Sequence, residues 1–278
     1  MIDVDGYLAV LGVERPGAPS AEALWALHRA AVERVPYENL DIHLGRPTTL
    51  DPAECVDRIV RGRGGYCFHL NGAFAALLDA LGYEVTLHTA GVQGTPQDEP
   101  NLGGEHLGLT VRLDGEVWMA DVALAGGLYE PVPLRKGTYA QGPFTVTLEP
   151  SEVAPGGWRF RHDPQGPFTA VDFAPEPVEL SSFAATHHRL STSPESGFVR
   201  TLTAQLSDAK GMFLLRSRLL RRIEAAGTED RVIDSAEEFE EVLADVFRIS
   251  QEGITDAERA ELWRRACAQH EEWTAEQG

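Results

Sequence analysis

The sequence predicts an α+β protein made of three consecutive blocks. In residues 1–85 the apolar positions recur at helical spacing. From Tyr83 the period changes to two, and prolines and glycines recur through Pro177, a pattern typical of short strands in a sandwich or barrel. Residues 186–278 mix strand-like runs with helices that open on capping-box patterns. We therefore expect one block at residues 1–85, one at 86–185 and one at 186–278.

The first block is expected to contain three helices. Ser20 is placed to cap the first helix, and residues 37–41 form a polar-aromatic loop after it. Asp51 opens a second helix, and a third begins near Cys67. The third helix is strongly apolar, which places it in the core.

In the third block, residues 182–196 resemble a linker. Residues 198–206 and 212–223 read as strands. Ser235 and Thr255 each stand three residues before a Glu, the capping-box pattern that opens a helix. The last block is therefore expected to combine a small sheet with two C-terminal helices.

Residues 106–122 predict a β-hairpin. Residues 106–113 alternate between apolar and polar positions, and the pair Asp114 and Gly115 is a two-residue hairpin signal. Residues 116–122 then run back as the second strand. The leucine face of this hairpin is expected to belong to the core.

The two-residue turn also sets the register of the hairpin. Leu113 then pairs with Glu116, and counting back places Asp121 opposite Gly108. His106 lies one diagonal step from Asp121 on the same face, and diagonal neighbours are roughly 7–8 Å apart at Cα. Gly108 is expected to leave open space opposite Asp121. The register alone therefore predicts a His–Asp pair.

Cys67 stands where a glycine-rich turn, R-G-G-Y-C-F at residues 63–68, leads into the third helix. The partial positive charge of a helix N-terminus favours a thiolate at such a position. A lone cysteine is more often a small buried apolar residue. A nucleophilic role for Cys67 therefore depends on partners.

His106 and Asp121 are those partners. Taken singly, each is more simply explained as a solvated strand residue. Together with Cys67 they match a nucleophile, a base that deprotonates it and a carboxylate that orients the base. The combination predicts covalent catalysis by a Cys-His-Asp triad.

Composition narrows the classes of protein. The chain has 278 residues, 43% hydrophobic and 24% charged, an ordinary globular mix. A net charge of −19 argues against nonspecific binding to nucleic acid or to an anionic membrane. There is neither an apolar run of about 18 residues nor a signal peptide. Cys55, Cys67 and Cys267 form no disulfide framework or metal motif, so we expect a reduced, cytoplasmic protein without a metal.

Several ordered motifs extend over most of the chain. They are Val35-Pro36-Tyr37-Glu38-Asn39-Leu40, Arg63-Gly64-Gly65-Tyr66-Cys67 followed by Asn71, the pair His106 and Asp121, and Ser191-Thr192-Ser193-Pro194-Glu195-Ser196-Gly197-Phe198. In this order they resemble the arylamine N-acetyltransferase family. The resemblance implies a helical bundle, a central antiparallel β-barrel and a C-terminal α/β lid around a cysteine-protease-like triad.

The resemblance also implies a two-step acyl transfer. Cys67 takes the acetyl group of acetyl-CoA, and an arylamine or hydrazine then accepts it, with His106 handling the proton and ping-pong kinetics as the result. Acetyl-CoA is here a substrate, with no metal, nucleic acid or membrane partner implied. The backbone amide of Phe68 is a candidate oxyanion donor. Phe68, Ala123, Leu124 and Gly126 are candidate coenzyme A contacts.

Two departures from the family pattern concern the substrates. The family usually has Glu or Gln two residues after the nucleophile, where this chain has His69. After the triad Asp the family commonly has Gly-aromatic-Gly, where this chain has Val122-Ala123-Leu124-Ala125-Gly126-Gly127. A wider or repositioned pocket would suit relatives that form amides or macrolactams in natural-product pathways. Such enzymes take acyl groups from carrier proteins, so an acyl carrier protein is an alternative partner.

Two other classes remain open. A thiol hydrolase of papain or transglutaminase type shares the triad, although the motif at residues 35–40 argues against it. A metal-binding protein using Cys67, His69 and His106 would quench the nucleophile. The pair His187 and His188 lacks a third ligand at useful spacing, which argues against a metal there.

Overall fold

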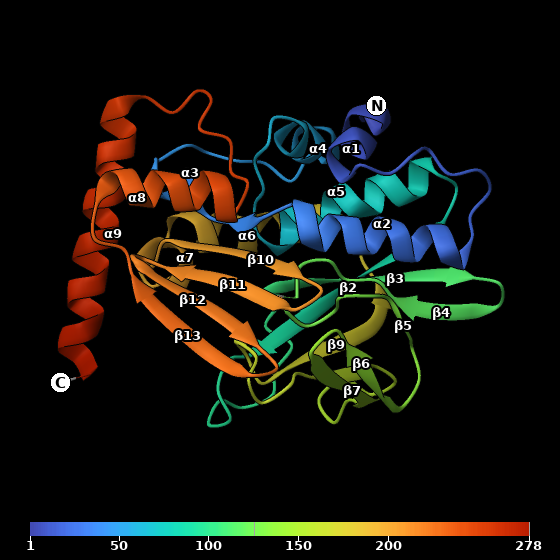
Figure 1. Cartoon of the computed structure of the whole chain (residues 1–278). Coiled ribbons are helices and arrows are strands. Elements are labelled where there is room, and N and C mark those ends of the chain that lie inside the picture. Colours follow the sequence, from blue (N-terminus) through green and yellow to red (C-terminus); the bar gives the residue numbers. More distant parts are fainter. Residues whose placement is uncertain (125, 278) are drawn as a thin grey trace.

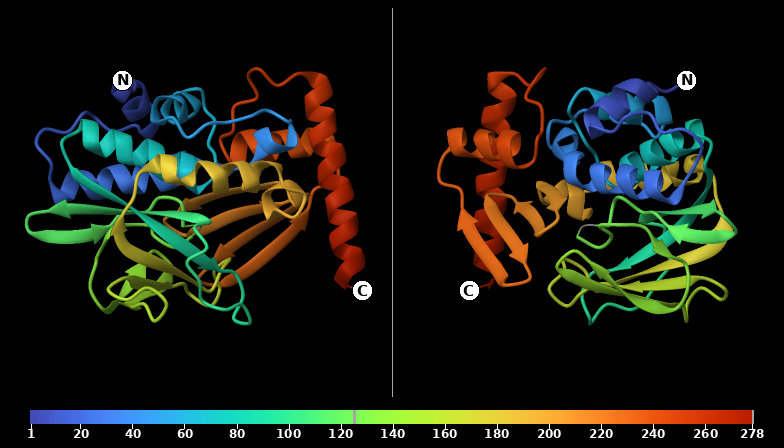
Figure 2. Two further views of the ribbon diagram at one scale, coloured as in Figure 1. Left: turned by 180° about the vertical axis from the view of Figure 1, so that it is seen from behind. Right: turned by 45° about the vertical axis from the view of Figure 1, so that its right-hand side comes forward.

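The computed structural model describes residues 1–124 and 126–277. A layer of helices covers one end of a β-barrel, and a second sheet with a long C-terminal helix lies beside both (Figures 1 and 2). This arrangement confirms the predicted α+β fold. Among the described helices, none is long and apolar enough to cross a membrane.

The helical layer is built around the third predicted helix. It contains α1 (Val4–Leu11), α2 (Ala21–Arg34), α3 (Leu40–His43), α4 (Pro52–Val60) and α5 (Cys67–Ala80). The expected caps are present: Ser20 Oγ accepts from Ala23 N at 3.2 Å, and Asp51 Oδ1 accepts from Ala53 N at 2.7 Å. Most side chains of α5 are buried, which explains its apolar sequence.

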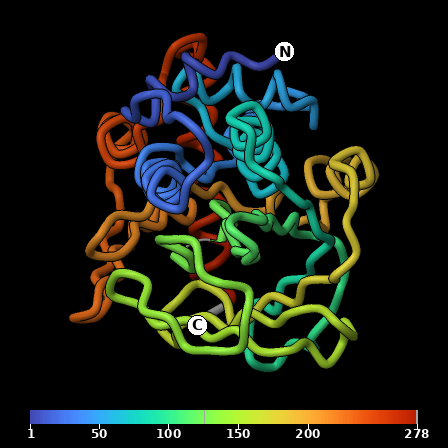
Figure 3. The backbone as a smooth tube through the Cα atoms, turned by 90° about the vertical axis from the view of Figure 1, so that its right-hand side faces the viewer, coloured from blue at the N-terminus to red at the C-terminus, as the bar shows by residue number. Residues whose placement is uncertain are grey.

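The barrel is an antiparallel sheet with the strand order β5-β4-β3-β2-β9-β8-β7-β6. Its strands are β2 (Glu84–Gln93), β3 (His106–Leu113), β4 (Glu116–Met119), β5 (Val132–Pro133), β6 (Gly137–Gln141), β7 (Phe144–Pro150), β8 (Trp158–Arg161) and β9 (Ala170–Pro177). Figure 3 shows these green to yellow strands curving round beneath the helices. The leucine face of β3 packs against α5, because Leu107, Leu109 and Val111 belong to the same core cluster as that helix.

The second sheet joins distant parts of the chain. Its order is β1-β10-β11-β12-β13, with β1 (Tyr37–Glu38), β10 (Thr203–Asp208), β11 (Gly211–Arg216), β12 (Leu219–Glu224) and β13 (Gly227–Val232). The C-terminal helical elements are α8 (Ala236–Glu241), the short π-helix η2 (Val242–Val246) and α9 (Asp256–Gln277). Both capping boxes form: Glu238 N donates to Ser235 Oγ at 3.1 Å, and Glu258 N donates to Thr255 Oγ1 at 3.3 Å.

Three expectations for the third block were wrong. Residues 182–196 are mostly helical, comprising the end of the 3₁₀ turn η1 (Leu180–Phe183) and α6 (Ala184–Thr192). The run 198–206 begins in the short helix α7 (Gly197–Arg200) before β10. The run 212–223 is two strands, because the chain reverses at Ser217, whose φ is +55°. The helix α6 was missed because its sequence is mostly polar. The turn at Ser217 was missed because the residues on both sides of it are apolar.

The predicted hairpin register is confirmed. Leu113 pairs with Glu116, and the turn residues Asp114 and Gly115 both have positive φ, at 52° and 81°. The expected open space at Gly108 is absent, however. A Cβ at Gly108 would lie 2.4 Å from Cδ1 of Phe173, so this ring fills the space.

Candidate active site

Cys67 is the first residue of α5, and its side chain is buried. The carbonyl of Tyr66 accepts from the amides of His69 at 2.9 Å and Leu70 at 3.1 Å, so the hydrogen bonds of the helix begin there. The amides of Cys67 and Phe68 belong to the first turn, where amides have no intrahelical acceptor. Cys67 Sγ lies 3.5 Å from the carbonyl oxygen of Glu105, just before β3. The sulfur therefore lies between a helix N-terminus and the start of the strand that carries His106.

The turn before Cys67 packs closely against β1. A Cβ at Gly64 would lie 1.8 Å from the carbonyl oxygen of Pro36, so only glycine fits. Gly65 forms a parallel bridge with Tyr37, and Glu38 N donates to Gly65 O at 2.9 Å. The expected loop at 37–41 was wrong, because these residues form β1 and the start of α3, and β1 supports the nucleophile turn.

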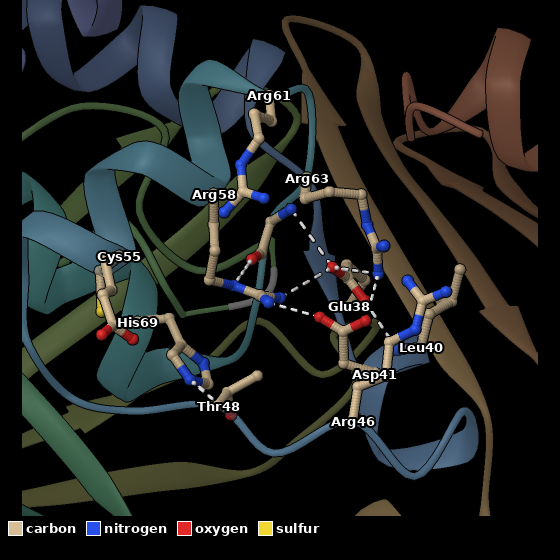
Figure 4. Close-up of polar contacts among 12 residues, drawn as sticks. Glu38, Leu40, Asp41, Arg46, Thr48, Cys55, Arg58, Arg61, Arg63 and His69 are labelled. Carbon is tan, nitrogen blue, oxygen red and sulfur yellow. Dashed lines mark hydrogen bonds and ion pairs between the residues drawn. The ribbon is translucent and has the colours of Figure 1, made fainter. Parts of the chain in front are cut away.

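A buried ionic cluster of Glu38, Asp41, Arg58 and Arg63 contacts the same turn (Figure 4). Glu38 Oε1 accepts from Gly64 N at 3.2 Å, from Arg63 Nη2 at 3.3 Å and from Arg58 Nη2 at 3.4 Å. Arg58 also donates through Nε to the Gly64 carbonyl at 3.1 Å and through Nη1 to Asp41. Both backbone polar groups of Gly64 are thus fixed by charged side chains, which makes the turn rigid.

Electrostatics in this cluster favour the charged forms. Burial raises the pKa of Asp41, but Arg63 and Arg58 outweigh burial and hold that pKa below its ordinary value. Burial likewise opposes the charge of Arg63, yet Glu38 and Asp41 raise its pKa. Sequence reasoning missed this cluster because its members are separated along the chain and carry no local pattern.

His106 and Asp121 form the predicted pair. His106 Nε2 lies 2.6 Å from Asp121 Oδ2, and both side chains are buried. Burial lowers the pKa of His106, but the Asp121 carboxylate and its hydrogen bond, with a smaller contribution from Cys67, raise it to about 10. Asp121 and Cys67 therefore both interact with His106 and favour its protonated form. The three predicted triad residues are brought together.

Asn71 fixes the orientation of Asp121. Its Oδ1 accepts from Val122 N at 3.0 Å, and its Nδ2 donates to Leu107 O at 2.6 Å, so backbone groups decide which way the amide points. The same Nδ2 donates to Asp121 Oδ1 at 2.7 Å, and Ala123 N donates to that oxygen at 2.9 Å. Asp121 Oδ2 is thereby left for the histidine.

Comparison with known proteins agrees with this geometry. The family described as N-acetyltransferase matches residues 20–255. The chain belongs to the arylamine N-acetyltransferase family. Arylamine N-acetyltransferase 1 of Oryctolagus cuniculus is 28% identical, over 90% of this chain and 94% of its own. The enzyme of Mycolicibacterium smegmatis is 29% identical, over 89% of this chain and 92% of its own.

Solved structures of arylamine N-acetyltransferases share the fold. The Nocardia farcinica enzyme has a TM-score of 0.85 at 30% identity, covering 94% of this chain and 93% of its own. The Mycobacterium marinum enzyme in complex with CoA has a TM-score of 0.85 at 27% identity, covering 95% and 98%. Membership of this family supports an acetyltransferase, and the Mycobacterium marinum relative binds CoA.

His69, the departure from the family's usual Glu or Gln, caps the nucleophile helix. Its Nδ1 accepts from Tyr66 N at 3.3 Å, and its Nε2 lies 3.2 Å from Thr48 Oγ1. Burial, with Arg58 and His187 nearby, holds the pKa of His69 well below 6.5, so the ring is a neutral acceptor. With both nitrogens engaged in this way, His69 is not directed at Cys67 as the metal-binding alternative requires.

A second histidine docks α6 on the nucleophile turn. His187 Nδ1 lies 2.5 Å from the Tyr66 hydroxyl, and its Nε2 lies 2.8 Å from Thr48 O. This contact connects the start of the third block to the residue that precedes Cys67. Within the described residues, no group of three or more His, Cys, Asp and Glu side chains is arranged to hold a metal.

The loop after Asp121 lines a narrow cleft. Ala123 and Leu124, together with Tyr37 and Ser207, line a space of about 20 Å³. Replacing the family's usual aromatic therefore does not leave a wider pocket at this point. Ala125 lies outside the described residues.

The other two candidate contacts pack against neighbouring side chains. The side chain of Phe68 is fully buried between Tyr66 and Phe183, which leaves only its backbone amide for a ligand. A Cβ at Gly126 would lie 2.6 Å from Sδ of Met212, so the barrel loop packs against the second sheet there. Glycine at 126 is explained by this packing and by its φ of +63°.

The remaining cysteines differ from Cys67 in their surroundings. Cys55 is buried in the helical core, where burial raises the pKa of its thiol to about 12. Cys267 is half-buried on α9.

Proposed function

We propose that this chain transfers the acetyl group of acetyl-CoA to the nitrogen of an arylamine or hydrazine through a thioester on Cys67. The observation that carries the proposal is the position of Cys67, at a helix N-terminus and beside a His106–Asp121 pair with a separation of 2.6 Å. Membership of the arylamine N-acetyltransferase family supports it. So does the CoA complex of the Mycobacterium marinum relative.

The first half-reaction makes the acetyl-enzyme. An imidazolium at His106 favours the thiolate of Cys67, which attacks the thioester carbonyl carbon. The new C–S bond forms, the bond from that carbon to the coenzyme A sulfur breaks, and His106 gives its proton to the departing thiolate. The backbone amide of Phe68 is proposed to stabilise the intermediate oxyanion.

The second half-reaction returns the enzyme to its first state. The amine nitrogen attacks the acetyl carbonyl carbon, and the now neutral His106 takes a proton from that nitrogen. The carbon–sulfur bond to Cys67 breaks, which releases the acetylated amine and restores the thiolate beside an imidazolium. Asp121 holds the ring in one orientation throughout.

Coenzyme A is proposed to enter at the cleft lined by Ala123 and Leu124, which lie close to Gly126 in the sequence. Because the cleft measures about 20 Å³, it must widen when the coenzyme binds. Free thiols are typical of reducing compartments, so the unpaired cysteines Cys55, Cys67 and Cys267 support a cytoplasmic location.

The kinetic pattern tests this mechanism. Initial rates measured while varying acetyl-CoA at several concentrations of an aromatic amine should give parallel double-reciprocal lines. Cys67→Ser should abolish turnover, whereas the control Cys55→Ser, which changes a buried cysteine outside the triad, should retain it. Intersecting lines, or turnover by Cys67→Ser, would contradict the acetyl-enzyme.

A further inference from the structure

The inner face of the barrel contains a cavity next to the triad. It has a volume of about 350 Å³, within the roughly 300–1,000 Å³ typical of small-molecule sites. Most of its wall is apolar or aromatic, including Leu109, Met119, Leu134, Trp158 and Phe173. An apolar chain is therefore the ligand that this cavity suits best.

Phe173 separates this cavity from His106. The two rings meet edge to face with centroids 6.1 Å apart, and Phe173 also lines the cavity. Ala90 pairs with His106 on one side and with Phe173 on the other, so the three residues form one row across β3, β2 and β9. The small side chain at Ala90 lets the two rings meet over it.

Two local features give Phe173 this position. Gly108 has no side chain, and the Phe173 ring occupies the place of its Cβ. In β9, residues 174–176 stand opposite the single residue Thr89 of β2, which makes a bulge directly after Phe173. Ala174 and Pro175 of this bulge line the cavity.

His106 connects Cys67 to the wall of this cavity. The Cys67 side chain interacts with the His106 ring, and that ring meets Phe173 edge to face. Each bond of an extended chain advances about 1.2 Å, so four bonds beyond an acetyl group advance about 5 Å. That reach is comparable with the 6.1 Å between the His106 and Phe173 rings.

On the basis of the proposed thioester at Cys67, we propose that Phe173 sets the length of the acyl group that the enzyme accepts. The ring closes the barrel cavity to the thioester site, so short acyl groups load and straight-chain aliphatic acyl groups are excluded. Removing the ring joins the cavity to the site and converts the enzyme to one that accepts longer acyl donors.

The test compares acetyl-CoA with hexanoyl-CoA on the full-length chain. Loading rates of Cys67 are followed by intact mass for wild type, Phe173→Ala and Phe173→Leu. Phe168→Ala, an equal truncation in the same barrel cluster but outside the cavity wall, is the matched control. Burying one methylene contributes about a factor of four. Phe173→Ala should therefore raise the hexanoyl-to-acetyl rate ratio about tenfold or more, with Phe173→Leu intermediate and Phe168→Ala unchanged.

Alkyl methanethiosulfonates test, without acyl transfer, whether Phe173 limits the length of an alkyl chain attached to Cys67. The Cys67 thiolate attacks their divalent sulfur, a disulfide to the alkylthio group forms, and methanesulfinate leaves. Peptide mapping assigns the adduct to Cys67, and retained labelling by the methyl reagent shows that each variant is folded at this site. The ratio of hexyl to methyl labelling should rise in Phe173→Ala but not in Phe168→Ala.

Acyl-CoA loading and alkyl methanethiosulfonate labelling together distinguish failure of the proposed function from failure of the proposed role of Phe173. If acetyl-CoA does not load wild-type Cys67, the proposed function fails, while the alkyl ratio still decides the role of Phe173. If acetyl-CoA loads normally and both length ratios stay the same in Phe173→Ala, the inference is overturned and Phe173 is only a packing residue. Equal effects of Phe173→Ala and Phe168→Ala would also overturn it.

Discussion

The structure determines what Asp121→Asn would do to the triad. Two donors, the Asn71 side-chain amide at 2.7 Å and the Ala123 backbone amide at 2.9 Å, converge on Asp121 Oδ1. An asparagine there must place its oxygen at that position, so its NH₂ group faces His106. His106 Nε2 then has to accept, which puts the ring proton on Nδ1.

That tautomer is wrong for catalysis. With Nε2 bound to residue 121, Nδ1 is the nitrogen left for Cys67, and a protonated Nδ1 in a neutral ring cannot take the thiol proton. The same substitution in serine-protease triads lowers kcat about 10⁴-fold, or about 5 kcal/mol of transition-state stabilisation. We expect a loss of that size in the rate of Cys67 acetylation, measured in single turnovers by intact mass.

Asp172→Asn is the matched control for this prediction. Asp172 is equally buried in the barrel, accepts from Ser151 Oγ at 2.7 Å and pairs with Arg159, away from the triad. Its substitution should lower thermal stability but leave the acetylation rate within about tenfold. An Asp121→Asn variant that acetylates Cys67 within tenfold of wild type would refute the argument from hydrogen-bond orientation.

Three further predictions concern the surroundings of the triad. Glu38→Gln weakens the buried pairing with arginine, so urea unfolding should show a loss of about 3–5 kcal/mol in free energy of unfolding. Gly108→Ala places a Cβ 2.4 Å from the Phe173 ring, and the same assay should show a cost of about 1–3 kcal/mol for overpacking. Burial lowers the pKa of His106, but Asp121 makes the largest contribution that raises it, so in a Cys67→Ala background the stability that the charged histidine contributes should be complete below pH 6.5 and decline as the pH rises above 6.5.

Each of these predictions has its own control. Glu84→Gln removes only an exposed pair with Arg112, whose side chains are 68% and 56% exposed, and should cost less than about 1 kcal/mol. Equal losses in the two glutamate variants would contradict the buried-cluster argument. The Gly108→Ala cost should vanish in Phe173→Ala, and its persistence would exclude the ring as the cause. If adding His106→Gln to Cys67→Ala leaves the pH dependence of the free energy of unfolding unchanged, His106 is not the group responsible for it.

Local patterns in the sequence predicted the parts of the site that lie within one hairpin. The Asp114–Gly115 turn fixes the register, and register alone brings His106 and Asp121 to one face. The helix start at Cys67 was predictable for the same reason, because glycines before an apolar helical run mark it locally.

Contacts with the active site from residues distant in the sequence could not be predicted in the same way. Glu38 acts on a turn 26 residues later, and its partners are identified only once β1 lies beside that turn. The helix cap made by His69 could not be predicted from the sequence, because the capping-box pattern has Glu or Gln at that position. The ring of Phe173 over Gly108 arises from a bulge between distant strands, which alternation of apolar residues does not reveal.

The central claim is that Cys67 carries the acetyl group. The most direct measurement is the intact mass of the protein after mixing with acetyl-CoA in the absence of any amine, followed by peptide mapping. We expect one acetyl adduct, located on Cys67 and discharged when an aromatic amine or hydrazine is added. Turnover of acetyl-CoA and amine without any adduct on Cys67, or an adduct on Cys67 that no amine discharges, would contradict it.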